Sequence, residues 1–158
     1  FPKLNQLNLG QGNFTRGSEH TIMDVNNVQC ATMICFESTL PSLNRDFVNA
    51  GAEVLLYVVN DGWYETPPQP QQHSKQVIFR AIENRRPVLR CANTGVSMVV
   101  DPIGNKLDEL QLNKKGILQA TIMPQNIITF YTRYGDIFAQ LNVIVLLLIM
   151  MSGFVRKK

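Results

Sequence analysis

The stretch ATMICFEST, Ala31–Thr39, places a thiol and a carboxylate directly after a run of apolar, strand-like residues. The run from Val28 to Cys35 predicts a buried strand, and Pro41 is suited to the first turn of a following helix. A turn between a strand and a helix exposes the side chain of the residue at the turn, and it brings backbone N–H groups close enough to bind an oxyanion. The start of a helix also favours a thiolate. Position alone leaves two interpretations of Cys35 open, a nucleophile or a packed core side chain.

The residues around this stretch predict alternating helices and strands. A helix is expected from Pro41 to Gly51, with Leu43, Phe47 and Ala50 on its apolar face. A largely buried sheet with helices packed on it accounts for the apolar strands, which predicts a layered α/β or α+β domain. The other expected elements are a loop over 1–20, strands over 53–59, 87–92, 96–101 and 116–122, a helix over 72–86, and turns over 60–62 and 101–105.

Composition bounds the classes of function. The chain has 158 residues, enough for one domain with a sizeable core, and a formal net charge of +3. Arg156, Lys157 and Lys158 supply three of the 15 basic residues, so the remaining 12 match the 12 acidic ones. A balanced domain argues against a nucleic-acid partner, which requires a basic face.

Cysteine and histidine spacing gives no metal-binding pattern. The three cysteines, Cys30, Cys35 and Cys91, form no CxxC motif, so a structural zinc site is not expected. A Cys30–Cys91 disulfide stays open at this point. His20 and His73 stand alone, which favours surface or hydrogen-bonded roles over metal ligation. No metal or organic cofactor is expected.

The end of the chain carries the strongest physical signal. Residues 137–155 contain no charge over 19 positions, and as a helix they would extend about 28 Å, close to a hydrocarbon core of about 30 Å. We expect a transmembrane helix rather than a buried core helix. The basic tail 156–158 would remain in the cytoplasm, which places the preceding domain on the other side of the membrane. Tyr131, Arg133 and Tyr134 suit the membrane interface.

Several motifs occur in a defined order, and together they resemble the carbon–nitrogen hydrolase (nitrilase) superfamily. The resemblance is closest to its membrane-bound branch, the apolipoprotein N-acyltransferases, and covers nearly the whole chain. The motifs are GNFTRGS (12–18), ICFE (34–37), NDGWY (60–64), QH (72–73), RAIENRRPVLR (80–90), NTG (93–95) and DPIGN (101–105). The resemblance implies part of an α-β-β-α sandwich over 1–130, an interfacial linker over 131–136, a membrane helix over 137–155 and a cytoplasmic tail over 156–158.

The resemblance also implies roles for individual residues. Cys35 would be the nucleophile and Glu37 the supporting carboxylate, which are the two catalytic residues expected in this chain. Phe36, Asn60, Asp61 and Trp63 would shape the active-site wall and bind substrate. The residues expected to pair charges in the scaffold are Arg80, Glu83, Arg86 and Arg90.

The family's glutamate base and lysine should precede the cysteine. Lys3 is the only lysine before Cys35, and neither it nor Glu19 lies in a suitable motif. The chain begins at Phe1 without an initiator methionine or signal peptide. We therefore expect both catalytic groups upstream, in a longer protein, and expect this fragment to be inactive alone.

The implied reaction is acyl transfer through a cysteine thioester. The acyl donor would be a phospholipid, and the acceptor the amine of a diacylglyceryl-cysteine on an apolipoprotein. The implied location is the bacterial inner membrane, with the domain on the periplasmic side. Two alternatives stay open: an amidase or nitrilase that hydrolyses C–N bonds, and a non-catalytic module anchored to the membrane.

Overall fold

A computed structural model describes residues 17, 19–64 and 68–155, with the side chains of 153–155 excepted. Some of the sequence predictions lie outside these residues. They are the GNFTRGS loop apart from Gly17, the residue Lys3, and the basic tail 156–158.

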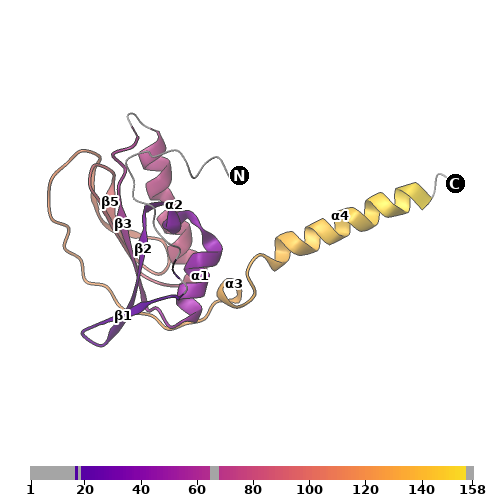
Figure 1. Cartoon of the computed structure of the whole chain (residues 1–158), viewed down its shortest axis with the longest axis horizontal. Coiled ribbons are helices and arrows are strands. Elements are labelled where there is room, and N and C mark those ends of the chain that lie inside the picture. The colour runs from indigo at the N-terminus through magenta and orange to yellow at the C-terminus, as the bar shows by residue number, and fades with distance from the viewer. Residues whose placement is uncertain (1–16, 18, 65–67, 156–158) are drawn as a thin grey trace.

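Six strands form one sheet in which spatial order equals chain order (Figure 1). The central pairs β2–β3 and β3–β4 are parallel, and the outer pairs are antiparallel. The strands are β1 (Ile22–Val25), β2 (Val28–Ile34), β3 (Val54–Val59), β4 (Val88–Ala92), β5 (Ser97–Val100) and β6 (Lys106–Leu110).

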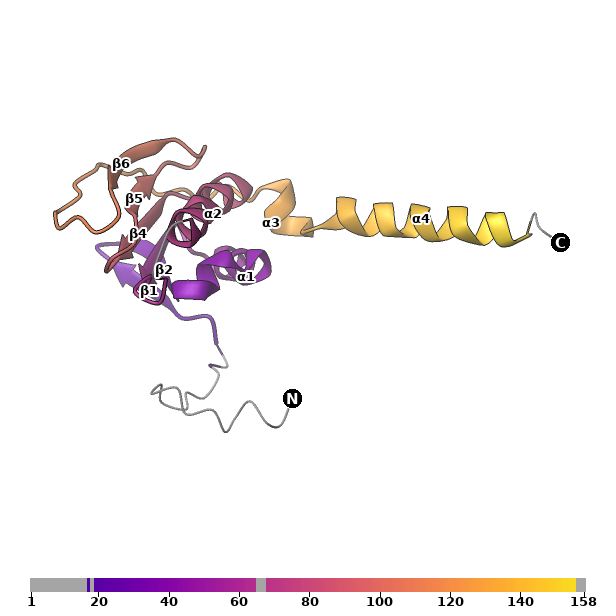
Figure 2. The same ribbon diagram turned by 90° about the horizontal axis from the view of Figure 1, so that it is seen from above.

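Helices cover one face of the sheet. The 3₁₀ helix η2 (Cys35–Thr39) leads into α1 (Pro41–Asn49), and α2 (Gln69–Asn84) joins β3 to β4. Figure 2 shows the sheet and the α1–α2 layer as two neighbouring layers. The predicted α1 and the predicted strands β2, β3, β4 and β5 are confirmed. The helix α2 begins before the predicted Gln72 and ends two residues earlier than predicted, because Arg85 adopts a left-handed φ of 51°.

The core lies between the sheet and the helices. Phe47 and Val48 of α1 are buried, whereas Ala50, predicted on the same face, is exposed because α1 has already ended there. Asn44 is also buried, where its amide accepts a hydrogen bond from the hydroxyl of Tyr57 at 2.5 Å. The apolar side chains that join them include Ala31, Met33, Leu55, Val77, Ala81, Val88 and Val100.

The opposite face of the sheet is only partly covered. Ile34 and Val58 are 66% and 55% exposed there. In the described residues the domain therefore has two layers, one sheet and one helix layer, which is half of the predicted four-layer sandwich.

Two strands were missed by the sequence prediction, and one predicted strand is wrong. The strands β1 and β6 lie over residues to which the sequence analysis assigned no element. Residues 116–122 form no strand. Because β6 occupies the sheet edge, this segment crosses the outer face, where Leu118 lies in a cavity lined also by Leu56 and Leu89.

The predicted linker 131–136 is largely a short helix, α3 (Phe130–Tyr134), fastened to the domain. Thr129 donates to the carbonyl of Glu83 at 2.6 Å, and the buried Thr132 hydroxyl donates to Asn84 at 3.1 Å. Asn49 donates to the carbonyl of Thr132 at 3.2 Å. The start of the last helix is therefore held against α1 and α2.

The last helix, α4 (Ile137–Val155), projects away from the helix layer (Figures 1 and 2). From Phe138 to Met151 its large apolar side chains are 52–78% exposed, from Ile144 at the low end to Phe138 at the high end, whereas Ile137 at the start of the helix is half-buried. Among the described residues, no helix combines the length and the apolar character needed to cross a membrane.

The disulfide left open between Cys30 and Cys91 does not form. Both thiols are free, and they lie on β2 and β4 with β3 between them. Two strand spacings amount to about 10 Å, beyond the Cα separation of about 7 Å that a disulfide tolerates.

Candidate functional site

Cys35 lies at the turn between β2 and η2, as the sequence predicted. Its φ is +50°, a left-handed conformation that costs a non-glycine residue about 1–3 kcal/mol. Such strain is typical of nucleophiles that a sharp strand-to-helix turn presents. The half-buried thiol contacts the carbonyl oxygen of Asn60 at 3.6 Å.

Glu37 stabilises this turn. Its Oε2 atom accepts a hydrogen bond of 2.7 Å from the backbone N–H of Ile34, the residue before Cys35. A carboxylate that accepts a backbone N–H makes a charge-assisted hydrogen bond, stronger than a neutral one. The structure thus brings the predicted carboxylate to the backbone that holds the nucleophile.

The loop after β3 forms the adjoining wall. Asn60 accepts hydrogen bonds from the N–H of Gly62 at 3.0 Å and from the Asn93 amide at 2.6 Å. Because β2, β3 and β4 are parallel, Cys35, Asn60 and Asn93 follow strands that end at one edge of the sheet.

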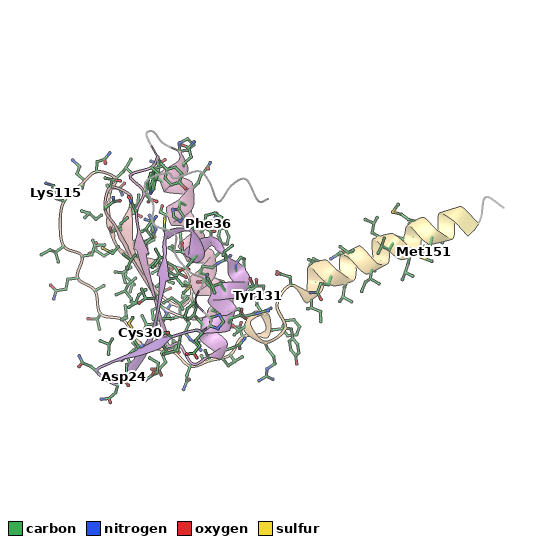
Figure 3. The ribbon with its side chains drawn as sticks, viewed as in Figure 1. Asp24, Cys30, Phe36, Lys115, Tyr131 and Met151 are labelled. Atoms are coloured by element: carbon green, nitrogen blue, oxygen red, sulfur yellow. The ribbon has the colours of Figure 1, made fainter. Side chains whose placement is uncertain are left out.

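Two exposed aromatic side chains, Phe36 and Trp63, belong to the same edge. They are 66% and 62% exposed. In Figure 3, Cys30 and Phe36 lie toward opposite ends of the sheet. Cys30 is on β2, and Phe36 follows the end of β2 that leads into the turn. The segments that follow β2 and β3 therefore each carry one accessible aromatic side chain.

Asp61 differs from its neighbours because it is 1% exposed. Its Oδ1 lies 2.8 Å from Nδ1 of His73, and its Oδ2 accepts from Arg90 at 2.7 Å. Burial raises the pKa of this carboxyl, but the hydrogen bonds and charges of His73 and Arg90 outweigh burial and hold the pKa below its ordinary value. Asp61 is thus an ionised group at the centre of a buried cluster.

Ser38 connects this cluster to the nucleophile. Its hydroxyl donates to the carbonyl of Cys35 at 2.7 Å and lies 3.4 Å from Nε2 of His73. Sequence reasoning did not single out Ser38, and it treated His73 as a lone histidine. The available signal was positional, because a serine three residues after Cys35 in a helical turn can reach its carbonyl.

Among the described residues, the predicted charge pairing is found for Arg80, Glu83 and Arg90 but not for Arg86. Arg80 pairs with Glu83 at 2.8 Å, and Arg90 pairs with Asp61. Arg86 is 1% exposed and donates to the carbonyls of Ala52 and Ile127, each at 2.6 Å.

Among the described residues, no side chain in hydrogen-bond contact with the Cys35 thiol could act as its base. The thiol of Cys35 contacts a backbone carbonyl, which cannot take its proton. No group of three His, Cys, Asp or Glu side chains within the described ranges could hold a metal ion. The geometry therefore suits a cysteine that attacks a carbonyl carbon after a base from elsewhere removes its proton.

Comparison with known proteins places this geometry in a family. The family model described as carbon-nitrogen hydrolase matches residues 6–131. The chain belongs to the carbon-nitrogen hydrolase family.

Solved carbon-nitrogen hydrolase structures have the same fold. The enzyme from Helicobacter pylori G27 superposes with a TM-score of 0.63 at 22% identity, over 70% of this chain and 45% of that one. An amidase from Nesterenkonia sp. superposes with a TM-score of 0.54 at 20% identity, over 63% of this chain and 40% of that one.

Relatives in sequence are carbon-nitrogen hydrolases named apolipoprotein N-acyltransferase. The protein from Geobacter metallireducens is 34% identical over 88% of this chain and 27% of its own length. The protein from Thermotoga maritima is 42% identical over 72% of this chain and 23% of its own length. The chain thus spans about a quarter of the length of these relatives.

Proposed function

We propose that this chain is the nucleophile-bearing part of an apolipoprotein N-acyltransferase. The observation that carries the proposal is Cys35, held with a left-handed φ at a strand-to-helix turn. Its support is the sequence identity of 34–42% to relatives that bear this name. The activity belongs to the full-length protein, in which we place the glutamate base and the lysine upstream of Phe1.

The proposed reaction has two steps. The upstream glutamate takes the proton of the Cys35 thiol, and the thiolate attacks an ester carbonyl of a phospholipid. The tetrahedral oxyanion, held by the upstream lysine, collapses, and the lysophospholipid leaves as an alcohol with that proton. The amine of a diacylglyceryl-cysteine then attacks the thioester, and its proton passes through the upstream glutamate to the sulfur of Cys35, which leaves as the free thiol while the acceptor departs as the N-acylated amide. A covalent intermediate thereby divides one difficult transfer into two easier ones.

The residues around Cys35 receive the following proposed roles. Glu37 holds the turn through the N–H of Ile34. Phe36 and Trp63, both largely exposed, would receive the acyl chain of the donor. Asn60, which contacts the thiol through its carbonyl, would form the wall together with Asp61, whose carboxylate anchors that loop from beneath.

We also propose that residues 137–155 insert into the membrane. The support is an uncharged sequence of 19 residues that forms a helix, with large apolar side chains from Phe138 to Met151 that are more than half exposed. Figure 3 shows Met151 far from the domain, on the part of α4 that no other element contacts. Both substrates of the proposed reaction are embedded in lipid, so a domain tethered at the bilayer would meet them there.

This membrane arrangement predicts which residues a membrane-impermeant thiol reagent can reach. In a background that carries both Cys35→Ala and Cys91→Ser, Ile117→Cys should react in intact spheroplasts, because Ile117 is 95% exposed on the domain and Cys30 is only 5% exposed. Lys158→Cys should react only after the membrane is permeabilised. Equal labelling of both positions in intact spheroplasts would refute the proposed topology.

The reaction itself is tested by trapping the thioester. The full-length protein, incubated with radiolabelled phosphatidylethanolamine, should acquire an acyl group that neutral hydroxylamine releases. Cys35→Ala should abolish the adduct, whereas Cys91→Ser should retain it, because Cys91 lies on β4, which β3 separates from β2 and its turn. An adduct that persists in Cys35→Ala would refute the proposal. Hydrolysis of a small amide without any lipid adduct would indicate an amidase.

A further inference from the structure

A chain of buried polar contacts leads from the backbone of Cys35 into the domain. The Ser38 hydroxyl donates to the Cys35 carbonyl at 2.7 Å and lies 3.4 Å from Nε2 of His73. On its other side, His73 contacts Asp61 at 2.8 Å. Ser38, His73 and Asp61 are 0%, 6% and 1% exposed. The contacts are therefore internal to the fold.

The orientation of His73 is determined by its partners. Asp61 is ionised and can only accept, so Nδ1 of His73 carries the proton between them and Nε2 faces Ser38. The second carboxylate oxygen of Asp61 is occupied by Arg90 at 2.7 Å. The imidazole cannot turn away from Ser38 without breaking its buried hydrogen bond to Asp61.

We propose that Ser38 and His73 are positioning residues for Cys35, acting through the Cys35 carbonyl. This rests on the proposed function, in which Cys35 is the nucleophile. A residue with a φ of +50° needs its surroundings to hold it, and the direction of its carbonyl is linked to the direction of its side chain. Ser38 holds that carbonyl, and His73 limits the positions that the Ser38 hydroxyl can take.

The same turn provides a matched control. Thr39 donates to the carbonyl of Phe36 at 2.7 Å, three residues back, which is the relation of Ser38 to Cys35. The bond of Thr39 is exposed, and its hydroxyl has no contact with the His73 cluster among the described residues. Loss of either hydroxyl removes one local hydrogen bond from η2, but only Ser38 acts on Cys35.

The experiment compares steady-state acyl transfer in the full-length protein, with phosphatidylethanolamine as donor and a diacylglyceryl peptide as acceptor. Ser38→Ala and His73→Asn should each lower kcat about tenfold while KM for the donor changes by less than about twofold. Thr39→Ala should keep kcat within about twofold of the unmodified protein. Since both residues act on one carbonyl, the double variant should be no slower than the slower single variant.

A second readout does not depend on acyl transfer. In a Cys91→Ser background, iodoacetamide reports on Cys35, because Cys30 is 5% exposed. The alkylation rate should change by about threefold or more in Ser38→Ala and His73→Asn and stay unchanged in Thr39→Ala. If neither the unmodified protein nor any variant forms a thioester, the proposed function fails. The alkylation rate of Cys35 still decides the positioning role.

Two results would overturn the positioning role. One is a Thr39→Ala variant that loses as much kcat and changes alkylation as much as Ser38→Ala. The other is a double variant whose losses multiply, which would mean independent actions. If His73→Asn does not fold, the comparison of Ser38→Ala with Thr39→Ala decides alone, because each removes one hydroxyl group and its local hydrogen bond.

Discussion

Gly95 lies directly against the carboxylate of Asp61. A Cβ atom added at Gly95 would overlap Oδ2, Cγ and Cβ of Asp61. The NTG motif after β4 therefore leaves the space in which the Asp61 carboxylate meets His73 and Arg90. Because Gly95, after β4, has no side chain, the carboxylate of Asp61, after β3, has room to form its buried ion pair with Arg90.

Gly95→Ala should displace Asp61 and destabilise the domain by about 1–3 kcal/mol, the usual cost of overpacking. The free energy of unfolding of the full-length protein, measured in urea, checks this. Gly17→Ala is the control, because an added Cβ atom there meets nothing within 4 Å. Equal stabilities of the two variants would contradict the predicted overlap.

The depressed pKa of Asp61 predicts a loss of stability in acid. Its folded pKa lies below the unfolded value of about 3.9, so in this range the unfolded state binds more protons and stability rises with pH. The contribution of Asp61 is thus fully present above about pH 4 and is lost as the pH falls through the lower folded pKa. Thermal unfolding between pH 7 and pH 2 measures it. Asp61→Asn should be less stable at pH 7 and show a shallower acid slope, and parallel curves would be inconsistent with the ion pair.

Glu37 and its variants separate geometry from charge. Because the carboxylate accepts from the N–H of Ile34, Glu37→Gln keeps an acceptor in place and should retain thioester formation within about threefold. Glu37→Ala removes the acceptor and should lower the rate about tenfold or more. The rate of adduct formation in the full-length protein is the measurement. A Gln variant as slow as the Ala variant would show that the charge of Glu37, rather than its hydrogen bond, is required.

Thr132 is the buried link between α3 and the helices of the domain. Thr132→Val removes the hydroxyl that contacts Asn84 and Thr129 and should cost about 1–3 kcal/mol, because it leaves buried polar groups unpaired. Urea unfolding of the full-length protein tests this. Thr121→Val, at an exposed position, should have a stability within about 0.5 kcal/mol of the unmodified protein. A Thr132→Val variant equal to this control would mean that α3 is held in another way.

Local patterns predicted the central part of the fold correctly. The apolar runs of β2, β3, β4 and β5 and the start of α1 at Pro41 are signals within a few neighbouring residues. The hairpin of β1 and β2 was missed, although Asn26 and Asn27, with φ of 53° and 66°, form the two-residue turn that asparagine favours. The predicted strand over 116–122 is wrong, because the position next to β5 is taken by β6 and residues 116–122 pair with no described strand.

The candidate site divides in the same way. Cys35 and Glu37 could be placed on the turn from sequence, since their relation is local. The contact of Asp61 with His73 joins a loop to a helix, and Arg90 reaches it from β4. Such contacts depend on how three elements pack, which periodicity does not encode. A lone histidine in the sequence thus proves to have two buried partners.

The order of the strands bears on how the protein is made. Each strand from β2 to β6 pairs with the strand that the chain supplied just before it. A chain that emerges from its amino end can therefore add each strand to an existing edge without waiting for a later segment, and mostly short-range pairing of this kind favours rapid folding. A domain with this topology is suited to folding progressively during synthesis or export.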